Sequence, residues 1–159
     1  NPERVWGLVL SGSNGGSVND EARLVRDEHQ NRKLDRPPGA LRALSLGFAA
    51  SKPEMAFLYR QFMRLNPKHD PDFLTVPPGY RGSTHERLTE SGVPILYIVG
   101  EDDALIAPKT IEIAASLVPQ SRLITMPEAG HSVYYEQPDV FNDYVHRFLT
   151  EVMPQATDG

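Results

Sequence analysis

Cysteine is absent from this chain of 159 residues. The chain can therefore form no disulfide, no thiol nucleophile and no metal site built on thiolates. Its five histidines lie far apart and lack the spacing of metal ligands, so we expect no metal and no other cofactor. Long hydrophobic runs are absent too, since none approaches the roughly 18 apolar residues that a membrane span requires. No association with a membrane is expected.

Positive charge is scarce relative to negative charge. The chain carries 16 Lys and Arg residues against 21 Asp and Glu residues, which gives a net charge of −5. This balance argues against nucleic acids and anionic lipid surfaces as partners. With 40% hydrophobic and 23% charged residues, the composition is that of one globular domain with its own core. We expect a cytoplasmic protein, although the chain begins at Asn1 instead of methionine and secretion stays open.

The most informative stretch places an acidic turn and a histidine turn after two successive strands. An apolar run from Val93 to Val99 ends at Gly100 and is followed by the acidic triplet 101–103. A helical segment and a second strand, Arg122 to Met126, then lead to His131. Parallel strands joined by a helix bring both turns to one edge of the sheet. The sequence therefore predicts an Asp–His pair that can orient and charge a general base.

Three motifs occur in order along this half of the chain. Gly100-x-x-Asp103 follows one strand, Gly130-His131 follows the next, and Glu136-x-Pro138 precedes a closing amphipathic helix. Together they resemble the second half of an α/β-hydrolase, and the resemblance is weakest over residues 18–92. It implies the fold class α/β, with the three-stranded parallel sheet portion of an α/β-hydrolase and an inserted helical cap.

The resemblance implies that Asp103 is the acid and His131 the base of a catalytic triad. Asp103 would accept a hydrogen bond from Nδ1–H of His131, and Nε2 would take the proton of the nucleophile. The neighbouring acids Glu101 and Asp102 are expected to face water or to cap the next helix. Gly100 supports this choice, because it allows a sharp turn that swings the third residue back to the sheet edge.

The resemblance also divides the chain into parts. Residues 1–17 and 83–153 are assigned to the hydrolase core, residues 18–82 to the cap and residues 154–159 to a flexible tail. Parallel, adjacent core strands are expected at Trp6–Leu10, Ile95–Val99 and Leu123–Met126. Helices that start after Ser83, Pro108 and Asp139 are expected to cover both faces of the sheet. The last helix is expected to bury one stripe, formed by Val140, Phe141, Tyr144, Val145, Phe148, Leu149 and Val152.

Helical spacing of apolar residues predicts three helices in the cap segment. The first, at about 20–32, turns Leu24 and Val25 inward. The second spans 40–50, and the third is opened by the capping box Ser51-x-x-Glu54. The third helix is expected to bury Met55, Leu58, Tyr59, Phe62 and Met63. Packing between cap helices is the favoured explanation of this stripe, while Tyr59 and Phe62 are also candidates for the wall of a substrate pocket.

The glycine-rich segment Ser11–Gly16 loosely imitates the nucleophile elbow G-x-S-x-G, with Ser13 in the central position. A true elbow leads into a buried helix that begins with small apolar residues, whereas Ser17–Glu21 is polar. We therefore favour a turn at the rim of the active site, where Ser13 is a candidate substrate contact, over a nucleophile. A plain strand-to-helix loop explains the segment equally well. The nucleophile and the oxyanion hole are then expected upstream of this chain.

Three more residues are candidate substrate contacts because of their position. Leu105 and Ile106 follow the acidic turn, where they could line an apolar pocket. Tyr134 follows the histidine at the same rim, as does Tyr135, although core packing is the favoured explanation for both tyrosines.

The predicted activity is that of a Ser-His-Asp hydrolase acting on a small, fairly apolar ester, lactone or related carbonyl compound. This chain would supply the acid and the base, and alone it would be inactive. An Asp nucleophile in the upstream half would instead give an epoxide hydrolase or a dehalogenase. A half-hydrolase kept as a non-catalytic binding module is the second class of function, and the presence of both Asp103 and His131 argues against it.

The expected partners, besides a small-molecule substrate, follow from the first strand. Unless another strand pairs with Trp6–Leu10, this strand exposes an apolar edge with unpaired N–H and C=O groups. We therefore expect the N-terminal half of the same hydrolase, or a second copy of the chain, to cover that edge.

Overall fold

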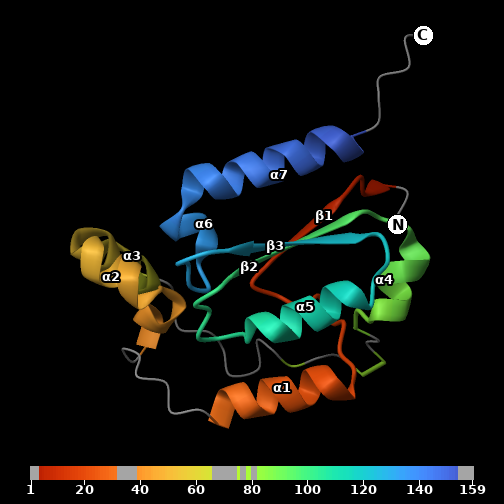
Figure 1. The fold of residues 1–159 in the computed structure, drawn as a ribbon, viewed down its shortest axis with the longest axis horizontal. Coiled ribbons are helices and arrows are strands. Elements are labelled where there is room, and N and C mark those ends of the chain that lie inside the picture. The colour runs from red at the N-terminus through yellow and green to blue at the C-terminus, as the bar shows by residue number, and fades with distance from the viewer. Residues whose placement is uncertain (1–3, 32–38, 66–74, 76–77, 80–81, 154–159) are drawn as a thin grey trace.

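A parallel sheet of three strands lies at the centre of the structure (Figure 1). The computed structural model describes residues 4–31, 39–65, 75, 78–79 and 82–153. The strands are β1 (Leu8–Ser11), β2 (Ile95–Gly100) and β3 (Ser121–Met126), in the order β1-β2-β3. Leu8 lies opposite Ile95, and Ile95 lies opposite Ser121. The prediction of three adjacent parallel strands is confirmed.

The first strand begins two residues later than predicted. The N–H of Leu8 donates to the carbonyl of Pro94 at 2.9 Å, where β1 starts to pair with β2. Trp6 precedes this bond and is exposed, so the prediction that it begins a buried strand is wrong. The paired strand is short and only partly buried along its length.

Side chains of the central strand alternate between two apolar layers, because successive strand residues point to opposite faces. Ile95 and Val99 pack with residues of α5 (Pro108–Ser116). Leu96 and Ile98 pack on the other face against α7 (Pro138–Val152), with Phe148 as its buried anchor. Figure 1 shows α7 on one side of the sheet and α5 on the other. The predicted covering of both faces is confirmed.

The chain enters β2 through α4 (His85–Ser91). Thr84 caps this helix by accepting the N–H of Arg87 at 3.4 Å, and Gly92 ends it in the left-handed region with φ of 64°. Leu88 packs against the same layer as α5. The helix therefore fixes both the start of β2 and one end of that layer.

The stripe that α7 buries is narrower than predicted. Phe141, Tyr144, Val145 and Val152 pack with the buried Phe148 against the sheet. Val140 and Leu149 are exposed, so their predicted burial is wrong. At 3.6 residues per turn, these two positions lie to the side of the stripe that faces the strands.

The first predicted cap helix lies against the core helix α5. This helix, α1 (Asp20–Asn31), starts where the Asn19 side chain accepts the N–H of Ala22 at 2.8 Å, and it packs beside α5 (Figure 1). Ala22 is the buried residue of α1. Leu24 is 72% exposed, so its predicted inward position is wrong, whereas Val25 lies on the α5 side beside Ala107. Ala22 and Val25 share the stripe that packs, and Leu24 lies off it.

The single helix predicted over residues 40–50 is two elements. A 3₁₀ helix, η2 (Gly39–Ala43), is followed by α2 (Leu46–Ser51), whose N-cap is Ser45. The hydroxyl of Ser45 accepts the N–H of Phe48 at 3.1 Å and starts a new helix at that point. The predicted capping box at Ser51 is wrong, because this hydroxyl donates to the carbonyl of Gly47 at 2.7 Å inside α2.

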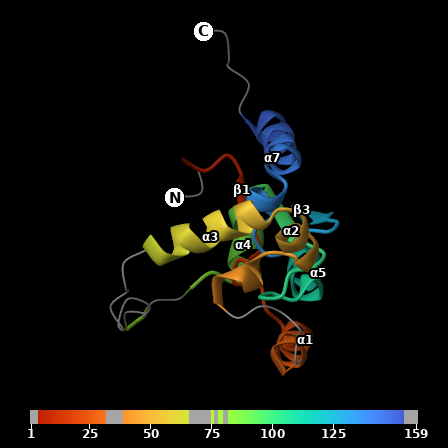
Figure 2. The same cartoon turned by 90° about the vertical axis from the view of Figure 1, so that its left-hand side faces the viewer.

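The next helix, α3 (Pro53–Leu65), buries fewer residues than its apolar pattern indicated. Ala56 and Tyr59 are its buried side chains, and they pack with Leu44 and Phe48. The predicted burial of Leu58, Phe62 and Met63 is wrong, since all three are exposed. Figures 1 and 2 show α2 and α3 beside the end of the sheet at which α6 (Val133–Glu136) lies.

Within the described residues, no helix is long and apolar enough to cross a membrane. The predicted tail, residues 154–159, lies outside the described residues, as does 66–74 of the predicted cap. The division of the chain into core and cap stays a prediction.

Candidate active site

The acidic turn after β2 buries one of its three carboxylates. Asp103 accepts the backbone N–H groups of Leu105 and Ile106 on Oδ1, at 2.8 and 2.9 Å. Its other oxygen, Oδ2, lies 2.8 Å from Nδ1 of His131. Glu101 and Asp102 are exposed, as predicted. The predicted contact between Asp103 and His131 is therefore present.

Gly100 allows the two turns to touch. A Cβ built on this residue would lie 2.1 Å from the carbonyl oxygen of Gly130 and 2.3 Å from that of Ala129. Any side chain would push the histidine turn, residues 129–132, away from the end of β2. The N–H of Asp102 also donates to the carbonyl of Ala129 at 2.9 Å. These contacts bring the carboxyl ends of β2 and β3 together.

The end of β1 completes the arrangement through a second glycine. A Cβ built on Gly12 would lie 2.7 Å from Cε1 and 2.8 Å from Nδ1 of His131. The imidazole therefore packs directly on the backbone of Gly12, whose φ is 57°. No sequence motif had given Gly12 a role. Its position directly after a strand that ends at the same sheet edge is the signal that could have identified it.

The environment of His131 favours its protonated form. The hydrogen bond to Asp103 raises the pKa of His131, burial opposes this rise, and the charge of Asp103 adds to it. The imidazole is 30% exposed, whereas the Asp103 side chain is fully covered. Among the described residues, none forms a hydrogen bond with Nε2. The carboxylate of Asp103 is thus buried, and Nε2 of His131 is available to bond to another group.

Ser13 lies next to Gly12 but is not bonded to the imidazole. It is exposed, and its hydroxyl accepts the N–H of Gly15 at 3.2 Å. Gly15 and Gly16 both have positive φ, so the segment is a tight glycine turn. The turn lies at the edge that holds His131, and substrate contact by Ser13 stays a prediction.

Three of the predicted substrate contacts bond to residues of the site. Leu105 and Ile106 donate their N–H groups to Asp103, and Ile106 also packs against the layer of β2 and α5. Tyr59 is buried, and its hydroxyl lies 2.8 Å from Oγ of Ser132. These contacts place all three residues close to the acid–base pair, and none of them tests substrate binding.

The other two candidates lie at the surface. Phe62 is 52% exposed on α3. Tyr134 is exposed and packs edge to face on Phe141, with 6.2 Å between ring centroids. Tyr135 is the tyrosine of this pair that packs inside, against Phe48 and Tyr59. Substrate contact by Phe62 and Tyr134 stays a prediction.

Glu136 is a buried acid, a position that the motif Glu136-x-Pro138 did not predict. Its carboxylate accepts the N–H of Gly130 at 2.9 Å and that of Ser45 at 3.1 Å. Burial raises the pKa of Glu136, and its hydrogen bonds oppose this rise.

The described residues include no group of three or more His, Cys, Asp or Glu side chains that could hold a metal ion.

Residues 7–144 match the model of the Alpha/beta hydrolase family. This chain belongs to the alpha/beta hydrolase family. The resemblance drawn from the acid and histidine motifs is confirmed, and so is the fold class. A thermophilic esterase from Thermogutta terrifontis has a similar structure, with a TM-score of 0.66 and 23% identity over 96% of this chain. Est816, an N-acyl homoserine lactone degrading enzyme, has a TM-score of 0.63, with 23% identity over 93% of this chain.

Curated relatives resemble shorter parts of the chain. A candidate 2-succinyl-6-hydroxy-2,4-cyclohexadiene-1-carboxylate synthase of Bacillus subtilis is 38% identical over 74 residues, 46% of this chain and 27% of that protein. An uncharacterized carboxylesterase of the same organism is 36% identical over 67 residues, 42% of this chain and 22% of its own length. The chain spans 58% of the Thermogutta esterase and 60% of Est816. Membership of this family supports a hydrolase function.

Proposed function

We propose that this chain supplies the acid and the base of a Ser-His-Asp hydrolase. The observation that carries the proposal is the 2.8 Å contact between Oδ2 of Asp103 and Nδ1 of His131, at the sheet edge where three strand ends meet. In open parallel sheets, this edge is where ligands bind and reactive side chains gather. Family membership supports the same reaction class.

The geometry suits general base catalysis. Asp103 bonded to Nδ1–H holds His131 in the tautomer that leaves Nε2 unprotonated. Nε2 takes the proton of an attacking hydroxyl, and the imidazolium that forms is stabilised by the adjacent carboxylate. The same nitrogen then gives the proton to the leaving group. The backbone donors on Oδ1 keep the carboxylate plane fixed during both steps.

The nucleophile of this proposal lies outside the sequence of this chain. Ser13 is the serine that follows Gly12 at the imidazole, yet its hydroxyl bonds to Gly15 and not to His131. Acid and base without a positioned nucleophile cannot complete acyl transfer. The share of the esterase structures that the chain spans is consistent with this division.

The proposed substrate is a small, fairly apolar ester, lactone or related carbonyl compound. A relative described as a carboxylesterase supports an ester, and one structural neighbour is described as degrading a lactone. The exposed apolar side chains of α3 and of the turn after Asp103 would suit an apolar acyl or alcohol group.

Hydrolysis of p-nitrophenyl acetate tests the proposal. The purified chain is expected to show no turnover above buffer, whereas the chain produced together with its upstream coding segment is expected to show turnover. Turnover by the chain alone that Ser13→Ala abolishes would make Ser13 the nucleophile and overturn the proposed division. Hydrolysis of an epoxide or a haloalkane, but of no ester, by the longer product would indicate an Asp nucleophile. Absence of every such activity would favour a binding module.

A further inference from the structure

Glu136 is a buried carboxylate that the proposed acid–base chemistry does not use. It ends the one-turn helix α6, and the residue is only 3% exposed. Oε1 accepts the N–H of Gly130, and Oε2 accepts the N–H of Ser45. One carboxylate thus joins the residue before His131 to the N-cap residue of α2.

The two segments that Glu136 joins are in direct backbone contact. A Cβ built on Gly130 would lie 2.5 Å from the nitrogen of Ser45 and 2.7 Å from the carbonyl carbon of Leu44. The same position would lie 2.8 Å from Oε1 of Glu136. Position 130 requires glycine because a side chain would clash with the backbone of Leu44 and Ser45, and not because of its backbone conformation. The histidine turn therefore rests directly on the start of α2.

The residue after His131 is held by the same part of the chain. The N–H of Ser132 donates to the carbonyl of Ala43 at 2.9 Å, and its hydroxyl lies 2.8 Å from that of Tyr59 on α3. Ser132 is therefore bonded directly to Ala43 and Tyr59, and Gly130 is linked to Ser45 through the carboxylate of Glu136. The ring of His131 is bonded to Asp103 in the core. The position of the ring against Asp103 depends on a backbone turn that residues 43–59 hold in place.

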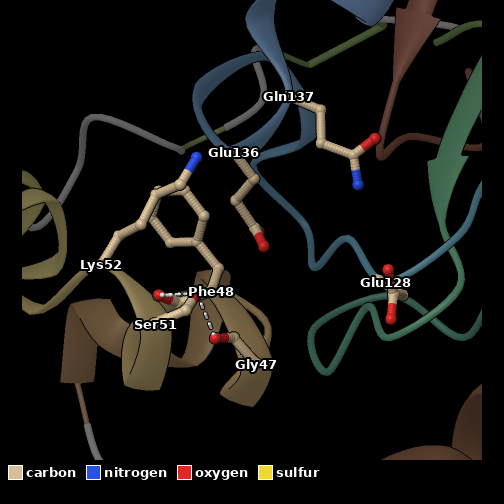
Figure 3. Close-up of a pocket in the computed structure, with 7 residues that line it drawn as sticks. All are labelled: Gly47, Phe48, Ser51, Lys52, Glu128, Glu136 and Gln137. Atoms are coloured by element: carbon tan, nitrogen blue, oxygen red, sulfur yellow. Dashed lines mark hydrogen bonds between the residues drawn. The ribbon is translucent and has the colours of Figure 1, made fainter.

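A cavity of about 410 Å³ lies beside the carboxylate, between α2 and the turn after β3 (Figure 3). It is lined by Gly47, Phe48, Ser51, Lys52, Glu128 and Gln137 together with Glu136. Figure 3 shows the Glu136 side chain pointing between Phe48 and Glu128. No Lys, Arg or His of the described residues lies within ion-pair distance of Glu136. The two backbone N–H groups hold the carboxylate, and the Ser45 side chain also favours its charged form by lowering the pKa of Glu136.

We propose that Glu136 is a positioning residue for His131, which holds the histidine turn against the start of α2 and so couples the base to α2 and α3. The inference rests on the proposed function, because that function makes His131 the base. A carboxylate suits this role, since it offers two acceptor oxygens to two donors from separate segments. An amide offers one acceptor and one donor, so Glu136→Gln leaves one buried N–H facing an NH₂ group.

The test compares variants of the chain by NMR titration of the His131 imidazole in ¹⁵N-histidine-labelled protein. Glu136→Gln removes one acceptor and one charge, and Glu136→Asp keeps the charge but is too short to reach both donors. Glu128→Gln is the matched control, because it removes a carboxylate from the same cavity and Glu128 is exposed. The charged and titratable groups around Glu136 that stay unchanged in the two Glu136 variants are Asp102, Lys52, Tyr59, Glu128 and His131.

Both Glu136 variants are expected to lower the pKa of His131 towards its ordinary value of 6.5, because the ring loses its fixed place against Asp103. Glu128→Gln is expected to leave the titration unchanged. Folded Glu136→Gln and Glu136→Asp proteins that titrate like the wild type would overturn the inference. An effect of Glu136→Gln that Glu136→Asp lacks would also overturn it, because charge alone would then be responsible.

If the variants do not fold, an NMR titration of the wild-type protein tests whether one carboxylate bonds to both Gly130 and Ser45. Burial raises the pKa of Glu136 above 4.5, and the amide protons of Gly130 and Ser45 should shift together as this one group titrates. Amides that shift with different midpoints, or not at all, would contradict the shared carboxylate.

Activity separates this inference from the function on which it rests. In a product that hydrolyses esters, Glu136→Gln should lower kcat by about 10²-fold with little change in KM, since misplacing a catalytic group by about 1 Å has such an effect. Equal kcat values in variant and wild type would refute the coupling. A wild-type product that hydrolyses nothing would refute the proposed function, and the NMR titrations would still decide whether Glu136 places His131.

Discussion

The two oxygens of Asp103 have different partners. Oδ1 accepts hydrogen bonds from two backbone N–H groups of the turn that follows, and Oδ2 is bonded to Nδ1 of the His131 imidazole. Backbone donors within two or three residues of an aspartate form a rigid local turn. The plane of the carboxylate is therefore set by the acidic turn itself, and the histidine docks onto an oriented acceptor.

This geometry makes the choice of acid testable. In a product that hydrolyses esters, Asp103→Asn should lower turnover by about 10⁴-fold, because the amide favours the wrong imidazole tautomer. His131→Ala should lower it by about three orders of magnitude or more. Asp102→Asn is the neighbouring control and should have a much smaller effect. Exchanged effects of the Asp102 and Asp103 variants would mean that the wrong acid has been chosen.

The raised pKa of His131 also predicts how stability depends on pH. The folded-state pKa lies above the ordinary value of 6.5, chiefly because of the hydrogen bond to Asp103. The stability that protonated His131 contributes is therefore fully present below pH 6.5, and it is lost as the pH rises through the folded-state pKa.

The unfolding free energy, measured by urea denaturation at pH values from about 5 to about 9, tests this effect. This range spans the ordinary titration of histidine. The difference in unfolding free energy between wild type and Asp103→Asn should shrink as pH rises through that range. Asp102→Asn, which changes the exposed carboxylate next to Asp103 in the same turn, is the matched variant for this comparison. A difference that grows with pH would contradict the assigned sign.

Sequence patterns at the residue scale predicted the contact between Asp103 and His131 but not the residues that support it. Asp103 lies three residues after the glycine that ends an apolar run, and His131 directly follows the glycine of the next turn, so both signals are local. Glu136 finds one of its partners at Ser45, which is 91 residues away in the chain. Gly12 acts through the space that it leaves for His131. The contact between Glu136 and Ser45 depends on tertiary packing and follows from no short motif, whereas the position of Gly12 directly after a strand is a signal in the sequence.

At the scale of elements, the site depends on turns that pack without side chains between them. Gly12, Gly100 and Gly130 each leave space for another strand end or turn. Gly12→Ala should therefore displace the imidazole and destabilise the fold by about 1–3 kcal/mol through overpacking. Gly47→Ala is the control, because a Cβ there meets nothing within 4 Å.

Thermal unfolding and the NMR titration of His131 together check this prediction. Gly12→Ala should lower Tm and change the His131 titration, whereas Gly47→Ala should change neither titration nor fold. A Gly12→Ala protein with wild-type Tm and wild-type titration would show that the imidazole does not pack on this backbone.

The helices show where apolar patterns are insufficient. In α3 the apolar residues wind around much of the helix, but only Ala56 and Tyr59 are buried in the described structure. In α7 the buried stripe is set by the strands that it faces, which leaves Val140 and Leu149 outside. Periodicity predicts that a helix exists, whereas the breadth of its buried face depends on its neighbours. The strands were easier to predict, because continuous apolar runs bounded by glycine and proline are specific.

At the scale of the whole molecule, β1 is one of the two edges of the described sheet. In the described residues it pairs with β2 alone. Alternate residues of a parallel strand bond to the same neighbour, so the N–H groups of Val9 and Ser11 face away from β2. We propose that an upstream strand of the same hydrolase, or a second copy of this chain, pairs with them.

Hydrogen exchange and light scattering test this pairing. With the upstream segment present, the amides of Val9 and Ser11 should exchange much more slowly than in the monomeric chain. If a second copy covers the edge, protection should instead rise with concentration, together with the mass of a dimer. A monodisperse monomer of 17.7 kDa that is fully active would contradict both forms of the proposal.

The most direct test of the central claim is the location of the reactive serine. The chain and its upstream segment would be labelled together with a fluorophosphonate, digested and sequenced by mass spectrometry. We predict one labelled serine, located upstream of residue 1, and strongly reduced labelling in His131→Ala and Asp103→Asn. A label on Ser13, or labelling that does not depend on His131, would contradict the claim that this chain supplies the acid and base to a nucleophile outside it.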